Sequence, residues 1–355
     1  MASPLRVGIL FGGRSAEHEV SVVSAQGVMA AIDRERFQVV PLGVTRDGAW
    51  LTPEETRDTL SAIKAERLAS LNAPPAVGGI RPQALDALGE LDIVFPLVHG
   101  TFGEDGSLQG FLEMLDVAYV GAGVAASAVG MDKALQQMIL RQAGMPVPQS
   151  LVVTASRWQA AGPTLALEVE GHIGYPCFVK PANSGSSIGT SKVRSREDLA
   201  DAMTEAFRFD RKALVEQAIE GRQVECAVLG NDHPQASPLG EIVFTREFYD
   251  YVAKYEDSTT KLIIPADLPP NLSSDLQAMA IAAFQAVDCA GMGRVDFFLG
   301  PDDQPYLNEI NTIPGFTPVS MYPKLWEAAG LSYRDLITRL IELGLERHHE
   351  RQSRV

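Results

Sequence analysis

The sequence has few of the residues that mark several common protein classes. Only three cysteines, Cys177, Cys226 and Cys289, occur in 355 residues, and their spacing fits neither a metal site nor a disulfide-rich domain. Basic residues number 30 against 45 acidic ones, and the net charge of −15 argues against a nucleic-acid or anionic-membrane partner. No apolar run reaches the roughly 20 residues needed to span a bilayer. We therefore expect a cytoplasmic protein.

Strand and helix signals alternate through the first third of the chain. Apolar strands are expected in RVGIL, FQVVPLGV, LDIVFPLVHG and VAYVG. Helix signals lie between them, from about Ser15 to Ile32 and in SLQGFLEML. Residues 52–90 carry mixed helix and strand signals interrupted by proline and glycine. This alternation is typical of a parallel sheet with helices on its faces. We predict an α/β domain over residues 1–130.

The remaining chain has a different pattern, and its length leaves room for one or two further domains. A helix is expected from about Ser127 to Ala143, and a long polar loop over 245–270. The other expected elements are strands at 150–154, 176–180, 190–193, 213–216, 224–229, 239–244, 294–299 and 305–310, and helices at 196–207, at 273–287 and after Pro323. We predict α+β domains over 131–215 and 216–355.

The sharpest local geometry lies in GRVDFFLGPDDQPYLNEIN, which ends at Asn311. A turn centred between Asp302 and Asp303 would put Asp296 opposite Glu309, and Arg294 opposite Asn311. These four side chains would share one face, and the opposite face would be apolar, with Val295, Phe297 and Ile310. Two carboxylates and an amide oxygen suit Mg²⁺. A solvated hairpin face is the alternative.

The segment VKPANSGSSIG places a lysine before a loop of glycine and serine. Lys180 follows an apolar strand, and Asn183–Gly189 offer N–H and hydroxyl groups that can surround phosphates. In a P-loop the lysine comes after the last glycine, so this segment does not match that motif. The alternative is a plain hairpin with a polar tip.

Four single residues are weaker candidates. Lys133 begins a predicted helix, where a positive charge opposes the helix dipole and hints at a nearby anion. Glu216 follows an apolar strand and could accept a hydrogen bond from an adenine amino group. Glu17 lies in the first turn of a helix behind two glycines, and His99 ends a predicted strand at a crevice. Each has an ordinary structural alternative.

The long loop contains FYDYVAKYEDSTT, with three tyrosines and Lys254. Loops of more than about 12 residues without secondary structure are usually lids or disordered linkers. The aromatic residues favour a lid.

Taken together, these residues resemble one family. The order and spacing of Lys133, Lys180, Glu216, Asp296, Glu309 and Asn311 are similar to those of the ATP-grasp ligases. Within that superfamily, GGRSAEHEVS, LVHGTFGEDGSLQG, VKPANSGSSIG, FYDYVAKY, GRVDFF and NEINTIPGFTPVSMYP closely resemble the D-alanine–D-alanine ligases. The resemblance covers nearly the whole chain. It implies a parallel-sheet domain followed by two α+β domains that clamp ATP.

The resemblance also implies an activity and a set of substrate contacts. Such ligases phosphorylate the carboxylate of one D-alanine with ATP, and the amine of a second attacks the acyl phosphate, for peptidoglycan precursor synthesis. Glu17 would hold the first ammonium and form a bridge with Ser186 and Tyr255. His99 would lie near the first substrate, and Ser320 and the Met321 N–H would receive the second carboxylate.

Nucleotide, metal and oxyanion roles follow from the same resemblance. Lys133 and Lys180 would bind the α- and β-phosphates, and Lys254 the γ-phosphate. Further ATP contacts would come from Glu216, Ile219 and Glu225, which is favoured for the ribose over the neutral Gln223 because a charged acceptor binds more strongly. Asp296, Glu309 and Asn311 would ligate two Mg²⁺, with Mn²⁺ as a possible substitute. Arg294 and the Gly315 N–H would stabilise the oxyanion.

Two enzymes and one binding protein are the alternatives. A D-alanine–D-lactate ligase of the glycopeptide-resistance type carries a different lid, so Tyr251, Lys254 and Tyr255 favour the dipeptide product. Another ATP-grasp carboxylate–amine ligase would not need SAEHEVS or PVSMYP. A non-catalytic ATP-binding protein would not need Arg294. The usual assembly of the family predicts a homodimer.

Overall fold

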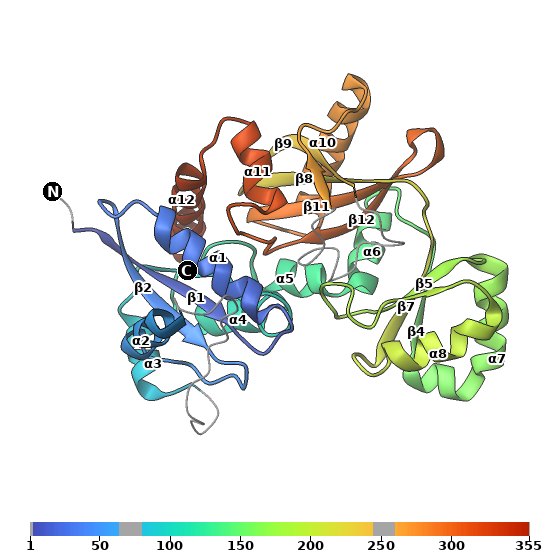
Figure 1. The fold of residues 1–355 in the computed structure, drawn as a ribbon, viewed down its shortest axis with the longest axis horizontal. Coiled ribbons are helices and arrows are strands. Elements are labelled where there is room, and N and C mark those ends of the chain that lie inside the picture. Colours follow the sequence, from blue (N-terminus) through green and yellow to red (C-terminus); the bar gives the residue numbers. More distant parts are fainter. Residues whose placement is uncertain (1–2, 64–79, 244–259, 355) are drawn as a thin grey trace.

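A computed structural model describes residues 3–63, 80–243 and 260–354. Its strands form three sheets within these ranges. In Figure 1 the N-terminal sheet, in blue, and the central sheet, in green and yellow, lie on opposite sides of the view, with the five-stranded sheet between and above them. None of the helices in these ranges is both long and apolar enough to cross a membrane.

The N-terminal sheet is parallel, as predicted. Its order is β2-β1-β3, with β1 at Leu5–Gly12, β2 at Phe37–Val44 and β3 at Ile93–Pro96. β1 is buried on both faces, which explains its continuous apolar run. Its helices are α1 (His18–Ala31), α2 (Pro53–Ile63), α3 (Pro82–Gly89) and α4 (Ser107–Met114).

Three details differ from the sequence prediction here. VAYVG forms only an isolated bridge, between Val94 and Tyr119. β3 ends at Pro96, so His99 lies in the loop beyond the strand and does not end it. Glu17 is the residue before α1 and lies outside its first turn. Both Glu17 and His99 therefore sit on connecting backbone next to the carboxyl ends of the parallel strands.

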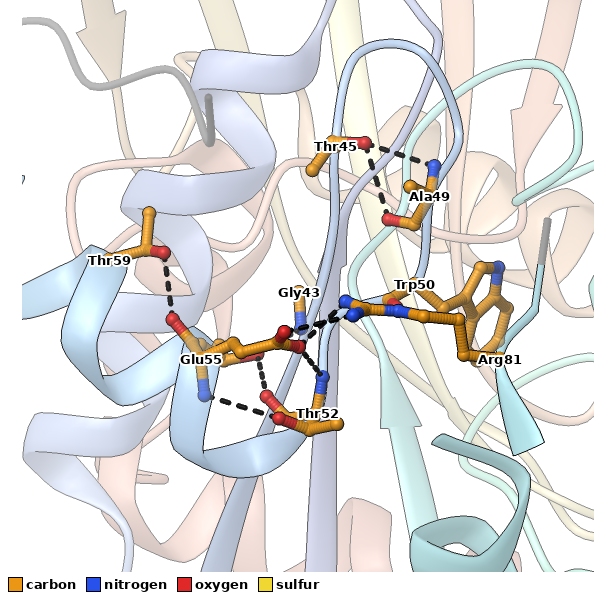
Figure 2. A network of polar contacts seen from close by, with 9 residues as sticks. Gly43, Thr45, Ala49, Trp50, Thr52, Glu55, Thr59 and Arg81 are labelled. Atoms are coloured by element: carbon orange, nitrogen blue, oxygen red, sulfur yellow. Dashed lines mark hydrogen bonds and ion pairs between the residues drawn. The ribbon is translucent and has the colours of Figure 1, made fainter. Parts of the chain in front are cut away.

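The start of α2 is held by a capping box. The Thr52 N–H donates to Glu55 Oε2 at 2.8 Å, and the Glu55 N–H donates to Thr52 Oγ1 at 3.3 Å. Arg81 adds two hydrogen bonds to the same carboxylate, at 2.9 and 2.6 Å (Figure 2). The pKa of Glu55 is lowered, first by the Thr52 N–H and then by Arg81.

The central sheet is antiparallel, with the order β4-β7-β5-β6. Its strands are β4 (Ser150–Thr154), β5 (Cys177–Pro181), β6 (Ser191–Val193) and β7 (Lys212–Gln217), and its helices are α7 (Ala155–His172) and α8 (Arg196–Ala206). The sequence reading missed α7. That helix contains Pro163 and a non-helical residue, Ala161, which interrupt the helical pattern.

The third sheet has the order β10-β9-β8-β11-β12. Its strands are β8 (Arg222–Gly230), β9 (Gln235–Val243), β10 (Lys261–Ile263), β11 (Gly291–Leu299) and β12 (Pro305–Asn311), with helices α10 (Pro270–Ala286), α11 (Met321–Ala328) and α12 (Tyr333–Gln352). The predicted loop over 245–270 is therefore too long, because β10 pairs with β9 and α10 begins at Pro270. Residues 244–259, with Lys254 and Tyr255, lie outside the described residues.

One predicted helix is in fact two. The stretch from Ser127 to Ala143 divides into α5 (Val124–Met131) and α6 (Lys133–Gln142). Asp132 lies between them in an extended conformation, and its Oδ1 accepts from the N–H groups of Ala134 and Leu135, each at 3.1 Å. A capping carboxylate begins a new helix, so the chain changes direction at this point. Lys133 is therefore the first residue of α6, as predicted.

Candidate active site

A cleft of about 1490 Å³ is lined by residues from all three sheets and their connections. Every predicted site residue that the structure describes lines it. They are Glu17, His99, Lys133, Lys180, Ser186, Glu216, Ile219, Glu225, Arg294, Asp296, Glu309, Asn311, Gly315, Ser320 and Met321. Residues from the beginning, middle and end of the chain thus face one space.

The hairpin of β11 and β12 has the predicted pairing at the site. Asp296 lies opposite Glu309, and Arg294 lies opposite Asn311. Near the turn, the pairing is shifted by one residue from the predicted register, because Leu299 pairs with Pro305 across a 3₁₀ turn. A β-bulge at Asn308 restores the predicted register for Asp296 and Arg294. The opposite face is buried, as expected: Val295, Phe297 and Ile310.

Arg294 balances the carboxylates on this face. Its Nε and Nη2 each donate to Asp296 at 2.7 Å, and its Nε lies 3.0 Å from Glu225. Burial alone would lower the pKa of Arg294, but Asp296, Glu225 and Glu309 outweigh burial and raise it well above its usual value. The guanidinium therefore offsets the repulsion between the facing carboxylates of Asp296 and Glu309.

The donor atoms on this face fit a hard cation. Asn311 Nδ2 donates to Asp296 Oδ2 at 3.0 Å, so the amide and the carboxylate are adjacent. No group of three or more His, Cys, Asp or Glu with metal-site geometry occurs in the part of the chain that the structure describes. The set of Asp296, Glu309 and Asn311 has two carboxylates and one amide oxygen. Such a partial set suits Mg²⁺, which takes its other ligands from water and phosphate.

Two lysines line the cleft, one on β5 of the central sheet and one on α6. Lys180 on β5 donates to Glu216 Oε1 on β7, and Gln137 on α6 donates to Glu216 Oε2. Lys133 at the start of α6 donates to the carbonyl of Ser184, in the loop after β5. The predicted phosphate-binding lysines thus lie beside the glycine- and serine-rich loop.

The loop after β5 also reaches the N-terminal domain. Ser186 Oγ donates to Glu17 Oε1 at 2.5 Å. A Cβ atom at Gly185 would lie 3.3 Å from Glu17 Oε2, so a glycine permits this close approach. The structure therefore brings together two of the three residues of the predicted bridge. The third, Tyr255, lies outside the described residues.

Glu104 is an ionisable residue near Glu17 to which the sequence analysis gave no role. Glu104 Oε1 is 4.0 Å from His99 Nδ1, and His99 is 3% exposed. Burial lowers the pKa of His99, but Glu104 and then Glu17 outweigh burial, so the net pKa is raised. Burial raises the pKa of Glu104, against the effect of His99. The motif GTFGEDG directly after His99 was the only sequence signal for Glu104.

The far end of the cleft is formed by the segment before α11. Ser320 Oγ accepts from the Thr317 N–H at 3.1 Å and lies 2.7 Å from Thr317 Oγ1. Ser320 precedes α11 and Met321 is its first residue, so the helix N-terminus can attract an anion. Gly315 lies beside Ser320, since a Cβ atom there would be 3.3 Å from Ser320 Oγ.

The remaining nucleotide candidates lie on β8 and just before it. Ile219 is in the connection from β7 to β8. Glu225 on β8 pairs with Asp296 on β11 and is 5% exposed, and Gln223 pairs with Phe298. Glu225 thus lies in the carboxylate cluster around Arg294, whereas Gln223 lies closer to the β7–β8 connection.

Comparison with known proteins gives consistent matches along the chain. Residues 6–122 match the family model "D-ala D-ala ligase N-terminus", and residues 139–342 match "D-ala D-ala ligase C-terminus". A D-alanine–D-alanine ligase of Geobacillus thermodenitrificans is 48% identical, over 98% of this chain and 97% of its own. D-alanine–D-alanine ligase A of Escherichia coli K12 is 49% identical, over 97% and 96%.

Solved structures agree with these sequence matches. The D-alanine–D-alanine ligase of Coxiella burnetii superposes with a TM-score of 0.81 at 36% identity, over 99% of this chain and 97% of that chain. The VanG D-Ala:D-Ser ligase of Enterococcus faecalis also has a TM-score of 0.81, at 34% identity, over 96% and 100%. The predicted fold class, a parallel-sheet domain followed by two α+β units of the ATP-grasp type, is confirmed.

Proposed function

Because the chain belongs to the D-alanine–D-alanine ligase family, we propose that it joins two D-alanines to D-alanyl-D-alanine in this cleft. ATP would be the phosphoryl donor, and the dipeptide would serve peptidoglycan synthesis in the cytoplasm. The observation that supports this best is the common cleft, which collects the candidate residues for both substrates, nucleotide and metal from all three domains. We also propose a homodimer.

The first D-alanine would bind between the N-terminal domain and the loop after β5. Glu17 would accept hydrogen bonds from the ammonium group, with Ser186 orienting its carboxylate from the other side. His99 would face the substrate carboxylate before phosphorylation, and Glu104 and Glu17, which raise its pKa against burial, favour the protonated imidazole. A salt bridge at each end of the amino acid would set which carboxylate oxygen points at the nucleotide.

Nucleotide binding would use the two lysines beside the loop after β5. Lys133 and Lys180 would turn to the α- and β-phosphates, and Glu216 and Ile219 would contact the adenine. We assign the ribose to Glu225, with Gln223 as the alternative. Lys254, outside the described residues, remains the candidate for the γ-phosphate.

Asp296, Glu309 and Asn311 would hold two Mg²⁺, or Mn²⁺ in their place. Bound metal would neutralise phosphate charge during phosphoryl transfer. The assignment is supported by the placement of the three side chains, which line the cleft from one face of the β11–β12 hairpin.

The second step needs an oxyanion site and a place for the second amino acid. Arg294 and the Gly315 N–H would donate to the oxyanion that forms when the amine attacks the acyl phosphate. Ser320 and the Met321 N–H at the start of α11 would bind the second carboxylate. An acyl phosphate hydrolyses in water, so the first step is productive only where water is excluded.

The second substrate can be tested directly against its alternatives. ATP, D-alanine, D-serine and D-lactate are supplied together, and the products are identified by mass spectrometry. We expect D-alanyl-D-alanine as the main product. A main product containing D-serine would match the activity in the name of the Enterococcus faecalis neighbour, and one containing D-lactate would identify a depsipeptide ligase. Absence of any ligated product would overturn the proposal.

A further inference from the structure

Gln136 on α6 makes an unusual set of contacts with β12. Its side-chain oxygen accepts from the Ile310 N–H at 3.0 Å, and its Nε2 donates to the Ile310 carbonyl at 3.1 Å. Nε2 also donates to the Gly130 carbonyl at 2.8 Å. Gln136 is 1% exposed. One amide therefore pairs with both peptide groups of a single residue, as a neighbouring strand would.

The position of Ile310 makes this pairing important for the site. β12 is the edge strand of its sheet, so one side of its backbone has no strand partner. Ile310 lies between Glu309 and Asn311, and its own side chain is 1% exposed in the apolar core. Because side chains alternate along a strand, Glu309 and Asn311 both face the cleft. Holding the peptide groups of Ile310 therefore holds both cleft-facing neighbours.

The same turn of α6 also contacts the central sheet. Gln137 donates to Glu216 on β7 and accepts from Ser150 Oγ at 2.6 Å. Consecutive residues of α6 thus connect one sheet through Ile310 and the other through Glu216. α6 therefore contacts both of the sheets that flank it.

We propose that Gln136 is a positioning residue for the metal-binding hairpin. It acts by keeping β12 at the distance and twist at which Glu309 and Asn311 face Asp296. This inference rests on the proposed assignment of Asp296, Glu309 and Asn311 as metal ligands. Groups that orient metal ligands typically contribute about 10- to 100-fold in metal affinity, which sets the size of the expected effect.

The test compares two buried or half-buried glutamines that bond to backbone in the same sheet. Gln136→Met removes the amide next to the metal hairpin. Gln277→Met is the matched control, because Gln277 donates to the Ser237 carbonyl on β9 at 2.7 Å, away from β12. Mn²⁺ binding is measured by electron paramagnetic resonance with a non-hydrolysable ATP analogue, and folding by circular dichroism. Both variants should melt at lower temperature than the parent chain, since each removes a side-chain hydrogen bond to the backbone.

Only Gln136→Met should weaken Mn²⁺ binding, by about ten-fold. A parent-like Mn²⁺ affinity in Gln136→Met would overturn the inference and leave Gln136 a stabilising residue. If Gln136→Met does not fold, Gln136→Asn takes its place, because a shorter amide cannot reach both groups of Ile310. Asp296→Asn tests the assignment of the metal ligands separately from the positioning role of Gln136. Unchanged Mn²⁺ binding in Asp296→Asn would refute the ligand assignment, whereas weakened binding there with unchanged binding in Gln136→Met refutes only the positioning role.

Discussion

Ser186 donates a hydrogen bond of 2.5 Å to Glu17, although 169 residues separate them in the chain. The bond joins the segment before α1 to the loop after β5, and it ends on a carboxylate, which makes it stronger than a neutral hydrogen bond. The proposed subsite for the first D-alanine is therefore built by contact between two domains.

Glu17→Gln should raise the KM for the first D-alanine by roughly ten-fold or more, with the KM for ATP unchanged. The ammonium group would lose its charged partner, and a hydrogen bond to a charged group contributes about 1.5–3 kcal/mol. Steady-state kinetics with each substrate varied in turn measures both constants. Glu55→Gln is the control, since it makes the same chemical change outside the cleft (Figure 2). A lower melting temperature with both KM values intact would reduce Glu17 to a structural residue.

Glu104→Gln should lower the pKa of His99. The carboxylate of Glu104 is the main group that raises this pKa against burial, from an ordinary value of 6.5. A histidine with a raised pKa contributes stability that is fully present below 6.5 and is lost as the pH rises through its folded-state pKa. The loss of stability in Glu104→Gln should therefore be larger below pH 6.5 than in alkaline solution. NMR titration of His99 measures the pKa, and an unchanged value would show that Glu104 does not control it.

Arg294→Lys should reduce kcat by about 100-fold, a typical loss for one oxyanion donor. A lysine keeps the positive charge but cannot donate two parallel hydrogen bonds to Asp296 while it reaches the oxyanion. Single-turnover measurement of dipeptide formation reports this step. Arg81→Lys breaks a similar two-point contact, with Glu55, outside the cleft and should keep the parent kcat. Equal kcat values for the two variants would remove Arg294 from the chemistry.

Glu55 should make a pH-dependent contribution to stability. Its pKa is lowered from 4.5, so the stabilisation is present above that value and is lost as the pH falls through the folded-state pKa. Urea denaturation of the parent chain and Glu55→Gln should differ near neutrality and converge well below pH 4.5. A difference that persists in acid would mean that the charge of Glu55 contributes nothing.

The sequence was sufficient to predict features that depend on short-range periodicity. The pairing of Asp296 with Glu309 follows from the alternation of side chains and a nearby turn, and it is confirmed. The same reasoning missed the bulge at Asn308, because a bulge shifts the strand register without changing the amino-acid composition. It also joined α5 to α6, since the capping role of Asp132 appears only once the direction of each helix is known.

By itself the sequence therefore determined the three strands of the parallel sheet, the β11–β12 hairpin and the residue types that face the cleft, because these depend on patterns that are local in the chain. Only the tertiary structure decided which distant groups meet. Glu104 beside His99, Gln136 on the backbone of Ile310 and Ser186 on Glu17 follow from how the sheets and helices pack. The physical reason is that such a contact depends on the relative placement of whole elements, which no local pattern of apolar and polar residues encodes.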